Sequence, residues 1–285
     1  MVSFIDCHLS LRRCSPFNGG KFEGWGTSFC WWPNRIGYLD ELSEQAAKLF
    51  FDPKEGLGLN IIRYNIGGGD DPTHHHITRT DSMVPGYAIN PSHDANGYHW
   101  SYDWNADQNQ RNVLMKVAEC YGKDLIVEGF SNSPPYFMTN SGCSSGSVNA
   151  GENNLREDAY GAFASYLADV AQHFSKEWGI HFQSMTAMNE PDTEYWHALS
   201  DKQEGCHFDP GESQSVMIIA LREALDERGL NDILISGTDE TGIDCQINSI
   251  NSLSEVARET IARIDTHSYL EGDNEGLRKL AQSYY

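Results

Sequence analysis

The sequence contains 285 residues, enough for one large domain or two ordinary ones, and its 39% hydrophobic and 21% charged content is typical of a folded globular protein. Its formal net charge of −21 disfavours nucleic acid and anionic membrane surfaces as partners, because both are negatively charged. No stretch approaches the roughly 20 apolar residues that span a bilayer. We therefore expect a neutral or cationic partner, and neither a nucleic acid nor a membrane, although solubility alone also explains the acidity.

The N-terminus does not predict a signal peptide, because it has no positive start and Asp6 and His8 interrupt any apolar core. We expect a cytoplasmic protein from this sequence as it stands, and a secreted one if its N-terminus is incomplete. The seven cysteines show no metal-like spacing, and a chain of this size needs no disulfide framework. Free thiols are therefore expected, with one or two bridges if the protein is exported.

Strands and helices are expected to alternate along the chain after a segment, residues 1–20, whose pattern predicts no element. The expected strands are 22–32, 59–66, 124–130, 182–188, 232–237 and 263–269. The expected helices are 39–51, 106–121, 158–178, 212–228, 253–262 and 275–285. Segment 70–105 is rich in Asp, His, Gly and Pro, which predicts a long irregular loop of the kind that usually has a function.

This alternation is typical of a parallel sheet with crossover helices, either doubly wound or closed into an eightfold barrel. No GxGxxG follows the first strand, and Gly67-Gly68-Gly69 is not followed by the Lys-Ser/Thr of a phosphate-binding loop. Polar and aromatic residues follow every strand, as on the upper face of a barrel. We therefore expect a (β/α)8 TIM-barrel type of fold, with about six of its eight units present in residues 21–285.

The segment Ser184–Pro191 indicates where chemistry takes place. A short apolar run leads directly into Asn189 and Glu190, and Pro191 then ends the strand because proline has no N–H to donate. A carboxylate at the end of a barrel strand lies where such enzymes hold their catalytic groups. Taken alone, the four residues Met188–Pro191 indicate that Glu190 is an ordinary solvated loop carboxylate.

Six short segments stand out within the expected strands or in the loops that follow them. In chain order they are Gly24–Trp32 (GWGTSFCWW), Arg63–Gly69 (RYNIGGG), Ser131–Met138 (SNSPPYFM), Met188–Pro191 (MNEP), Gln203–Cys206 (QEGC) and His267–Tyr269 (HSY). Together they resemble glycoside hydrolase family 30, and within it the endo-β-1,6-galactanase-like group. They occur in the order of the family and cover the chain from about residue 20 to its end.

The resemblance implies a retaining hydrolase that acts on a β-linked polysaccharide or oligosaccharide with two carboxylates and no cofactor. It implies that Glu190 is the general acid/base and that Asn189 hydrogen-bonds the sugar hydroxyl beside the reacting carbon. Such a pair suits glycoside hydrolysis, which needs a proton donor for the leaving oxygen and a second carboxylate at the anomeric carbon. The other residues expected to contact substrate or orient the nucleophile are Arg63, Trp31, Asn132, Tyr136, Trp196, His267 and Tyr269.

The sequence departs from the family in one respect that concerns mechanism. The nucleophile of the family follows the seventh strand in a Trp-x-Ser-Glu-like segment, and no such segment follows Tyr269. We therefore expect a truncated chain that is inactive and poorly stable by itself. Asp239 and Glu240 end the fifth strand and are interpreted as a polar pair at the rim, or as hydrogen-bonders of the substrate, rather than as substitutes for the nucleophile. Glu128 is expected to pair with Arg63.

Several alternatives remain open. The substrate is expected to be β-1,6-galactan, or else the glycan of another family 30 enzyme, such as a glucosylceramidase, xylanase or fucosidase; the chain could also be a non-catalytic carbohydrate-binding remnant. An aldolase would need a lysine at a strand end, and none is found. The run His74-His75-His76 with Asp70 and Asp71 is interpreted as a solvated loop and not as a metal site, and a monomer is expected.

Overall fold

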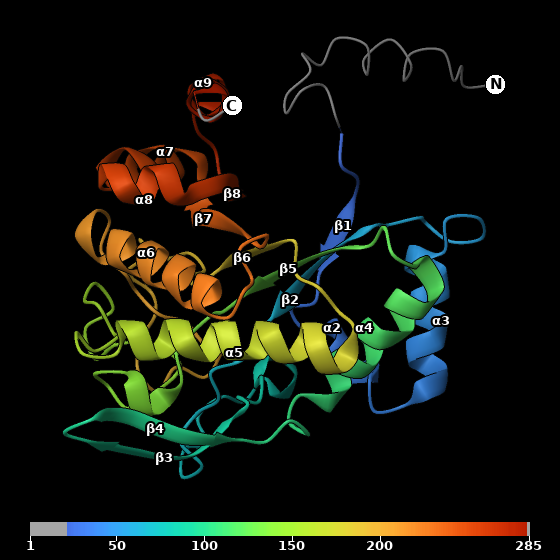
Figure 1. The fold of residues 1–285 in the computed structure, drawn as a ribbon, viewed down its shortest axis with the longest axis horizontal. Coiled ribbons are helices and arrows are strands. Elements are labelled where there is room, and N and C mark those ends of the chain that lie inside the picture. The colour runs from blue at the N-terminus through green and yellow to red at the C-terminus, as the bar shows by residue number, and fades with distance from the viewer. Residues whose placement is uncertain (1–21, 284–285) are drawn as a thin grey trace.

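The computed structural model describes residues 22–283, and its centre is a curved six-stranded parallel sheet (Figure 1). The expectation for residues 1–20 lies outside the described residues. The strands are β1 (Gly26–Ser28), β2 (Ile61–Asn65), β5 (Ile126–Phe130), β6 (Ser184–Thr186), β7 (Leu234–Gly242) and β8 (Ile261–Leu270). They follow one another in the sheet in chain order and every pair is parallel. The expected partial (β/α)8 barrel is thereby confirmed.

Helices connect the strands and cover one side of the sheet. They are α2 (Trp32–Ile36), α3 (Asp40–Phe51), α4 (Gln108–Tyr121), α5 (Tyr160–Trp178), α6 (Glu212–Glu227), α7 (Ile243–Ser252), α8 (Glu255–Thr260) and α9 (Asn274–Gln282), with short 3-10 turns η2 (Thr80–Ser82) and η3 (Tyr136–Met138). The helices α5 and α6 lie side by side across the strands (Figure 1). Among residues 22–283, no helix combines the length and apolar character that crossing a membrane requires.

Alternation along β2 explains how the sheet separates its core from its site. Ile62 and Tyr64 are fully buried, and the Tyr64 ring lies 5.1 Å from that of Phe174 on α5. Ile61 and Arg63 point to the other face, where they line a cavity of about 430 Å³. Successive side chains of a strand face opposite sides of its sheet, so the helices bury one set and the inside of the curved sheet receives the other.

The expectation of an irregular segment 70–105 is wrong for its second half, which forms an antiparallel hairpin, β3 (Ala88–Asp94) and β4 (Gly97–Tyr102). Ala95 and Asn96 form its turn, and Gly97, which pairs with Asp94 as the first residue of β4, has a φ of 110° that favours glycine. A bulge between Ile89 and Ser92 accommodates Pro91 and hides the alternation of the first strand. The hairpin lies beside α5, away from β1 (Figure 1).

Two element boundaries near the C-terminus also differ from expectation. The fifth predicted strand continues from residue 237 to Gly242, because its polar residues remain in the sheet and are buried. The single helix expected over 253–262 is instead α8, which the Ser254 side chain caps by accepting from the Ala257 N–H at 3.2 Å. The preceding helix, α7, was not predicted.

Candidate active site

Glu190 lies just beyond β6, and its backbone is fixed on both sides. Its φ of 50° is left-handed, which is unusual for a residue with a side chain. Its N–H donates to the Asp239 carbonyl oxygen at 2.8 Å, and its own carbonyl oxygen accepts from Thr193 Oγ1 at 2.7 Å and Trp196 Nε1 at 3.1 Å. Neighbouring loops therefore hold a strained backbone in place, as is common at functional sites.

The Glu190 carboxylate has a partner on each oxygen. His267 Nδ1 lies 2.7 Å from Oε1, and the Tyr195 hydroxyl donates to Oε2. The residue is only 7% exposed. A buried carboxylate in contact with an imidazole and a phenol has groups beside it that can exchange or orient a proton. The interpretation of Glu190 as an ordinary solvated loop carboxylate is therefore wrong.

Asp239, in the second half of β7, is the second carboxylate of this cluster. It also has a left-handed φ, 64°, and it is 1% exposed. Arg63 forms an ion pair with its Oδ2, and His267 Nε2 lies 3.2 Å from its Oδ1. The expectation that Asp239 and Glu240 form a rim pair is wrong, because both are buried at the centre of the fold.

Glu240 belongs to the packing behind the cluster. Its Oε1 accepts from Gln214 at 3.0 Å and from Ser249 at 2.7 Å, and its Oε2 accepts from the Asp192 N–H at 3.0 Å. Burial raises the pKa of Glu240 to about 7. The Glu240 carboxyl therefore joins α6, α7 and the loop after β6, and it does not line the 430 Å³ cavity.

Arg63 on β2 contacts two carboxylates and one amide from three neighbouring segments. In addition to Asp239 it lies 3.3 Å from Glu128, as expected, and it donates to Asn189 Oδ1 at 3.2 Å. Its guanidinium lies 3.5 Å from the centre of the Phe130 ring. Because Arg63 fixes the amide oxygen of Asn189, the Asn189 NH2, which makes no hydrogen bond within residues 22–283, remains available as a donor.

The charges of the cluster shift the protonation of two members. Burial lowers the pKa of His267, but its hydrogen bonds with Asp239 and Glu190 outweigh that effect and raise the pKa to about 9. Burial, followed by the negative charges of Glu128 and Asp239, raises the pKa of Asp265 above its usual range. His267 is therefore a cation at neutral pH, held between two carboxylates.

Four of the predicted site residues are thus brought together, namely Arg63, Asn189, Glu190 and His267. Tyr269 lies next to them, with its ring 5.2 Å from that of His267 and 74% of its surface exposed. The 430 Å³ cavity on the inner face of the sheet has Arg63, Asp239 and His267 in its wall. A ligand in this cavity would meet the charged cluster directly.

The other predicted residues do not present their side chains to this cluster's charged groups. Trp196 donates to the Glu190 carbonyl oxygen, but it is 6% exposed and its ring packs against Gly205, so it supports the loop and presents little ring surface to a ligand. The Trp31 ring is covered by the Arg79 guanidinium at 4.8 Å. Asn132 is buried after β5, and its amide nitrogen has no partner within the described part of the chain.

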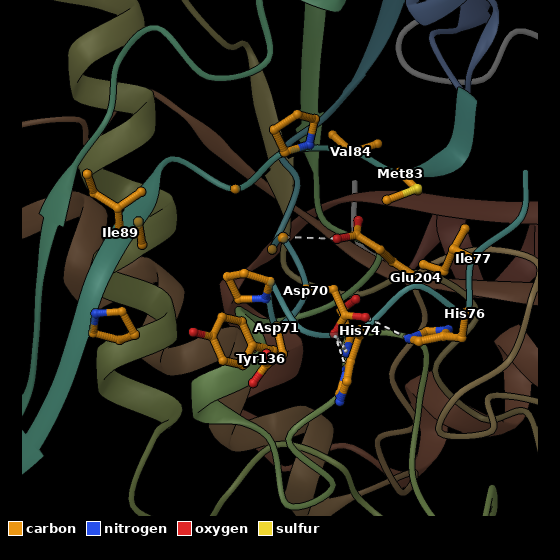
Figure 2. A pocket seen from close by; sticks show the side chains of 18 of the residues that line it. Asp70, Asp71, His74, His76, Ile77, Met83, Val84, Ile89, Tyr136 and Glu204 are labelled. Carbon is orange, nitrogen blue, oxygen red and sulfur yellow. Dashed lines mark hydrogen bonds and ion pairs between the residues drawn. The ribbon is translucent and has the colours of Figure 1, made fainter. Parts of the chain in front are cut away.

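Tyr136 lines a different and larger cavity, of about 620 Å³, between the loops above the sheet (Figure 2). Glu204 also faces this cavity and accepts from the Gly69 N–H at 3.0 Å. Burial raises the pKa of Glu204 well above its usual range. Its carboxyl and the Tyr136 hydroxyl give the cavity wall polar groups that can hydrogen-bond a polar ligand.

Sequence reasoning missed two contacts of Glu190. The sequence pattern does not predict that the Tyr195 hydroxyl donates to the carboxylate. Asp239 was set aside, although an acidic residue that ends the strand next to that of Glu190 was the available signal. The carboxyl ends of parallel strands lie at the same edge of the sheet, so residues that follow neighbouring strands are close in space.

The fold is shared with solved glycoside hydrolases. The catalytic domain of the family 30 xylanase C from Talaromyces cellulolyticus superposes with a TM-score of 0.64 at 21% identity, over 86% of this chain and 52% of that one. A conserved exported protein from Bacteroides fragilis gives a TM-score of 0.67 at 24% identity, over 82% of this chain and 46% of that one.

Two characterised relatives align along most of this chain. It is 37% identical over 274 residues to an endo-beta-1,6-galactanase from Hypocrea rufa, covering 90% of this chain and 54% of the relative. It is 26% identical to an exo-beta-1,6-galactobiohydrolase from Bifidobacterium longum subsp. longum, over 94% of this chain and 23% of that protein. The chain therefore spans about half of the first relative and about a quarter of the second.

The sequence profile of one hydrolase family matches most of the described fold. The model of O-glycosyl hydrolase family 30 covers residues 21–253, which include every strand from β1 to β7 and both Glu190 and Asp239. This chain therefore belongs to O-glycosyl hydrolase family 30.

Proposed function

We propose that the protein hydrolyses β-linked glycan with retention of configuration, that Glu190 is its general acid/base, and that β-1,6-galactan is its substrate. The observation that carries the reaction is the buried Glu190 carboxylate at a strand end, with Tyr195 on one oxygen and His267 on the other. The galactan specificity rests on the 37% identity to an endo-beta-1,6-galactanase.

In this mechanism Glu190 first donates a proton to the leaving glycosidic oxygen and later accepts one from the attacking water. A second carboxylate attacks the anomeric carbon from the other side, about 5–5.5 Å from the first. Asp239 is almost fully buried and paired with Arg63 and His267, so we assign it to positioning. The nucleophile is instead assigned, by family resemblance, to a strand that follows β8.

Substitution of Glu190 tests the acid/base role in the full-length gene product. Glu190→Gln should reduce hydrolysis of β-1,6-galactan by about 10²–10⁴-fold, since general acid/base groups contribute on that scale. An aryl galactoside with a good leaving group needs no proton and should lose much less in the first step. Glu194→Gln, which alters an exposed carboxylate four residues away, is the matched control and should keep full activity.

Azide distinguishes this role from a structural one. With Glu190→Ala, added azide can attack the glycosyl–enzyme without general-base assistance, and a β-galactosyl azide should form at a rate that increases with azide concentration. If Glu190→Gln keeps more than a tenth of the activity on galactan, or if azide yields no adduct and no acceleration, the assignment of Glu190 fails.

A substrate panel tests the specificity separately. β-1,6-Galactan should be cleaved in preference to xylan and β-1,6-glucan. Preference for another glycan would retain the reaction and replace the substrate with that of another family 30 enzyme. Binding of β-1,6-galactooligosaccharides without turnover by the full-length product would support a carbohydrate-binding remnant instead.

We also propose that the protein acts as a monomer without a nucleic-acid or membrane partner, and in the cytoplasm unless an upstream export signal exists. The strongly negative charge supports the absence of polyanionic partners. Light scattering during size-exclusion chromatography at neutral pH would test the monomer, since a dimer would double the measured mass.

A further inference from the structure

Four metal-ligating side chains meet in the loops above the sheet, apart from the charged cluster around Glu190. Asp70, His74 and His76 follow β2, and Cys143 comes from the loop between β5 and α5. One ligand atom from each lies within 4.8 Å of all the others. Figure 2 shows Asp70, His74 and His76 directed toward one another in the wall of the 620 Å³ cavity.

The separations resemble those between the ligands of one ion. His74 Nδ1 lies 3.3 Å from Asp70 Oδ1, and Cys143 Sγ lies 3.3 Å from His76 Nε2. Tetrahedral Zn²⁺ with bonds of about 2.0–2.3 Å places neighbouring ligand atoms roughly 3.3–3.8 Å apart. His76 Nε2 and Asp70 Oδ2 are closer, at 2.6 Å, and would have to separate by about 1 Å to admit an ion between them.

Backbone groups orient three of the four side chains from outside. His76 Nδ1 lies 2.6 Å from the Ser200 carbonyl oxygen, an arrangement in which Nδ1 carries the proton and Nε2 keeps its lone pair for a metal. The Ser144 N–H donates to Asp70 Oδ1 at 3.0 Å. The Leu199 N–H donates to Cys143 Sγ at 3.3 Å.

We propose that Asp70, His74, His76 and Cys143 bind one Zn²⁺ ion. One thiolate, two imidazoles and a carboxylate form a set that suits Zn²⁺ better than Mg²⁺ or Ca²⁺, which prefer oxygen ligands. Four protein ligands leave no open position, so the site is structural. The ion joins the loops that begin after β2 and β5, and through Ser200 and Leu199 it fixes the loop after β6 that also carries Glu190.

The sequence-based objection to a metal site, that three consecutive histidines cannot share one ion, applies only to His75. His75, which is exposed at the same cavity, has no ligand atom in the cluster, whereas His74 and His76 do. The fourth ligand comes from a loop some 70 residues further along the chain, at Cys143. Neither observation requires the proposed hydrolase activity, so the inference stands independently of it.

Cobalt substitution tests the site on the full chain without a histidine tag. The protein is depleted of metal by a chelator and titrated with Co²⁺. One equivalent should give visible d–d bands of tetrahedral Co²⁺ and a sulfur-to-cobalt charge-transfer band in the near ultraviolet, and Zn²⁺ should displace both. Cys143→Ser should abolish the charge-transfer band, and His76→Ala should weaken Co²⁺ binding at least 10-fold.

Matched controls separate this site from unspecific binding. His75→Ala removes the exposed histidine of the same run. Cys120→Ser removes a thiol on α4 that donates to the Ala47 carbonyl oxygen. Both variants should bind Co²⁺ like the wild type. If Cys143→Ser does not fold, His74→Ala, whose side chain is partly exposed, replaces it. The proposal fails if the wild type shows no charge-transfer band, or if its bound Co²⁺ is an adventitious ion only, weak and without one-to-one stoichiometry. It also fails if the two control variants lose Co²⁺ binding to the same extent as the ligand variants.

Discussion

In the Glu190 site, basic and acidic side chains alternate in space, and each is held by ion pairs with its neighbours. Arg63 faces Asp239 and Glu128, and His267 bridges Asp239 and Glu190. His267 therefore has two carboxylates that favour its protonated form. This single imidazole contacts the acid/base residue directly, and its own titration should be visible in the stability of the whole protein.

The first prediction concerns that titration. The pKa of His267 is about 9 in the fold and about 6.5 in an unfolded chain, so its stabilising effect is complete below about pH 6.5 and is lost as the pH rises through 9. His267→Gln should lower the free energy of unfolding at pH 6.5 by at most about 3 kcal/mol, and less where water screens the contacts. The difference from wild type should shrink toward pH 9.5.

Urea denaturation at several pH values provides the measurement, and the exposed His75→Gln is its control. The control should run parallel to the wild type over the whole range. A deficit of His267→Gln that is the same at pH 6.5 and pH 9.5 would show that the imidazole contributes packing and no charge.

A second prediction at this scale concerns Tyr195, which positions the acid/base carboxylate. Tyr195→Phe keeps the ring and removes the hydroxyl that donates to Glu190. Activity on β-1,6-galactan should fall by roughly 10-fold, because a hydrogen bond to a charged group contributes about 1.5–3 kcal/mol. The pH–rate profile should shift as well, whereas Tyr38→Phe, on an exposed side chain, should change neither.

Single residues of the site were predictable where local sequence sets their position. Glu190 follows an apolar run and precedes Pro191, and that pattern places it at a strand end. Its contacts were not predictable, because Tyr195 reaches it by the path of a loop and His267 from a strand 77 residues away. Cys143 was unrecognisable for the same reason, since its partners belong to another loop.

At the scale of elements, the hairpin β3–β4 is attached to α5 by polar and aromatic contacts. The Tyr102 hydroxyl donates to Asp169 at 2.5 Å, and Asp169 also accepts from Arg228 Nε at 2.6 Å. The Trp104 ring, just after β4, stacks on His173 with 3.7 Å between centres. Trp100 of the hairpin also packs against Phe137, and Tyr98 bonds Asp158, so these contacts with α5 are one part of what positions the hairpin.

Tyr102→Phe should therefore weaken the fold. It leaves the ring packing intact but removes a donor from a partly buried carboxylate, at a cost of about 1–2 kcal/mol in the free energy of unfolding. Tyr38→Phe, on an exposed ring, should remain within about 0.5 kcal/mol of the wild type. Equal unfolding midpoints in guanidinium chloride for the two variants would mean that the hairpin is held by stacking alone.

Helices and strands with a regular hydrophobic pattern were predicted from the sequence, and those without one were missed. The strands β2 and β5 and the helix α5 bury clear apolar faces, and their positions matched. The end of β7 carries Thr238, Asp239 and Glu240, which pattern assigns to a loop, yet tertiary partners bury them within the sheet. The hairpin was missed because Pro91 and its bulge interrupt the alternation, although Asn96 and Gly97 were visible in the sequence.

At the scale of the whole molecule, two opposing properties govern behaviour in solution. The sheet of the described residues has β1 and β8 as its edges, and an edge strand offers unpaired N–H and C=O groups to another chain. The end of β8 is also apolar and exposed at Tyr269 and Leu270. A net charge of −21 opposes association of such surfaces near neutral pH.

The last prediction follows from the loss of that charge. As the pH falls from 8 toward the pI of about 4.7, the repulsion between chains disappears and β8 should drive association. Leu270→Lys places a charge on this edge, whereas Leu57→Lys makes the same change at a residue 72% exposed and outside the sheet. Both variants have the same net charge, so a difference between them isolates the edge. Light scattering should then show Leu270→Lys remaining monomeric to a lower pH than Leu57→Lys, and coincident curves would attribute the association to net charge alone.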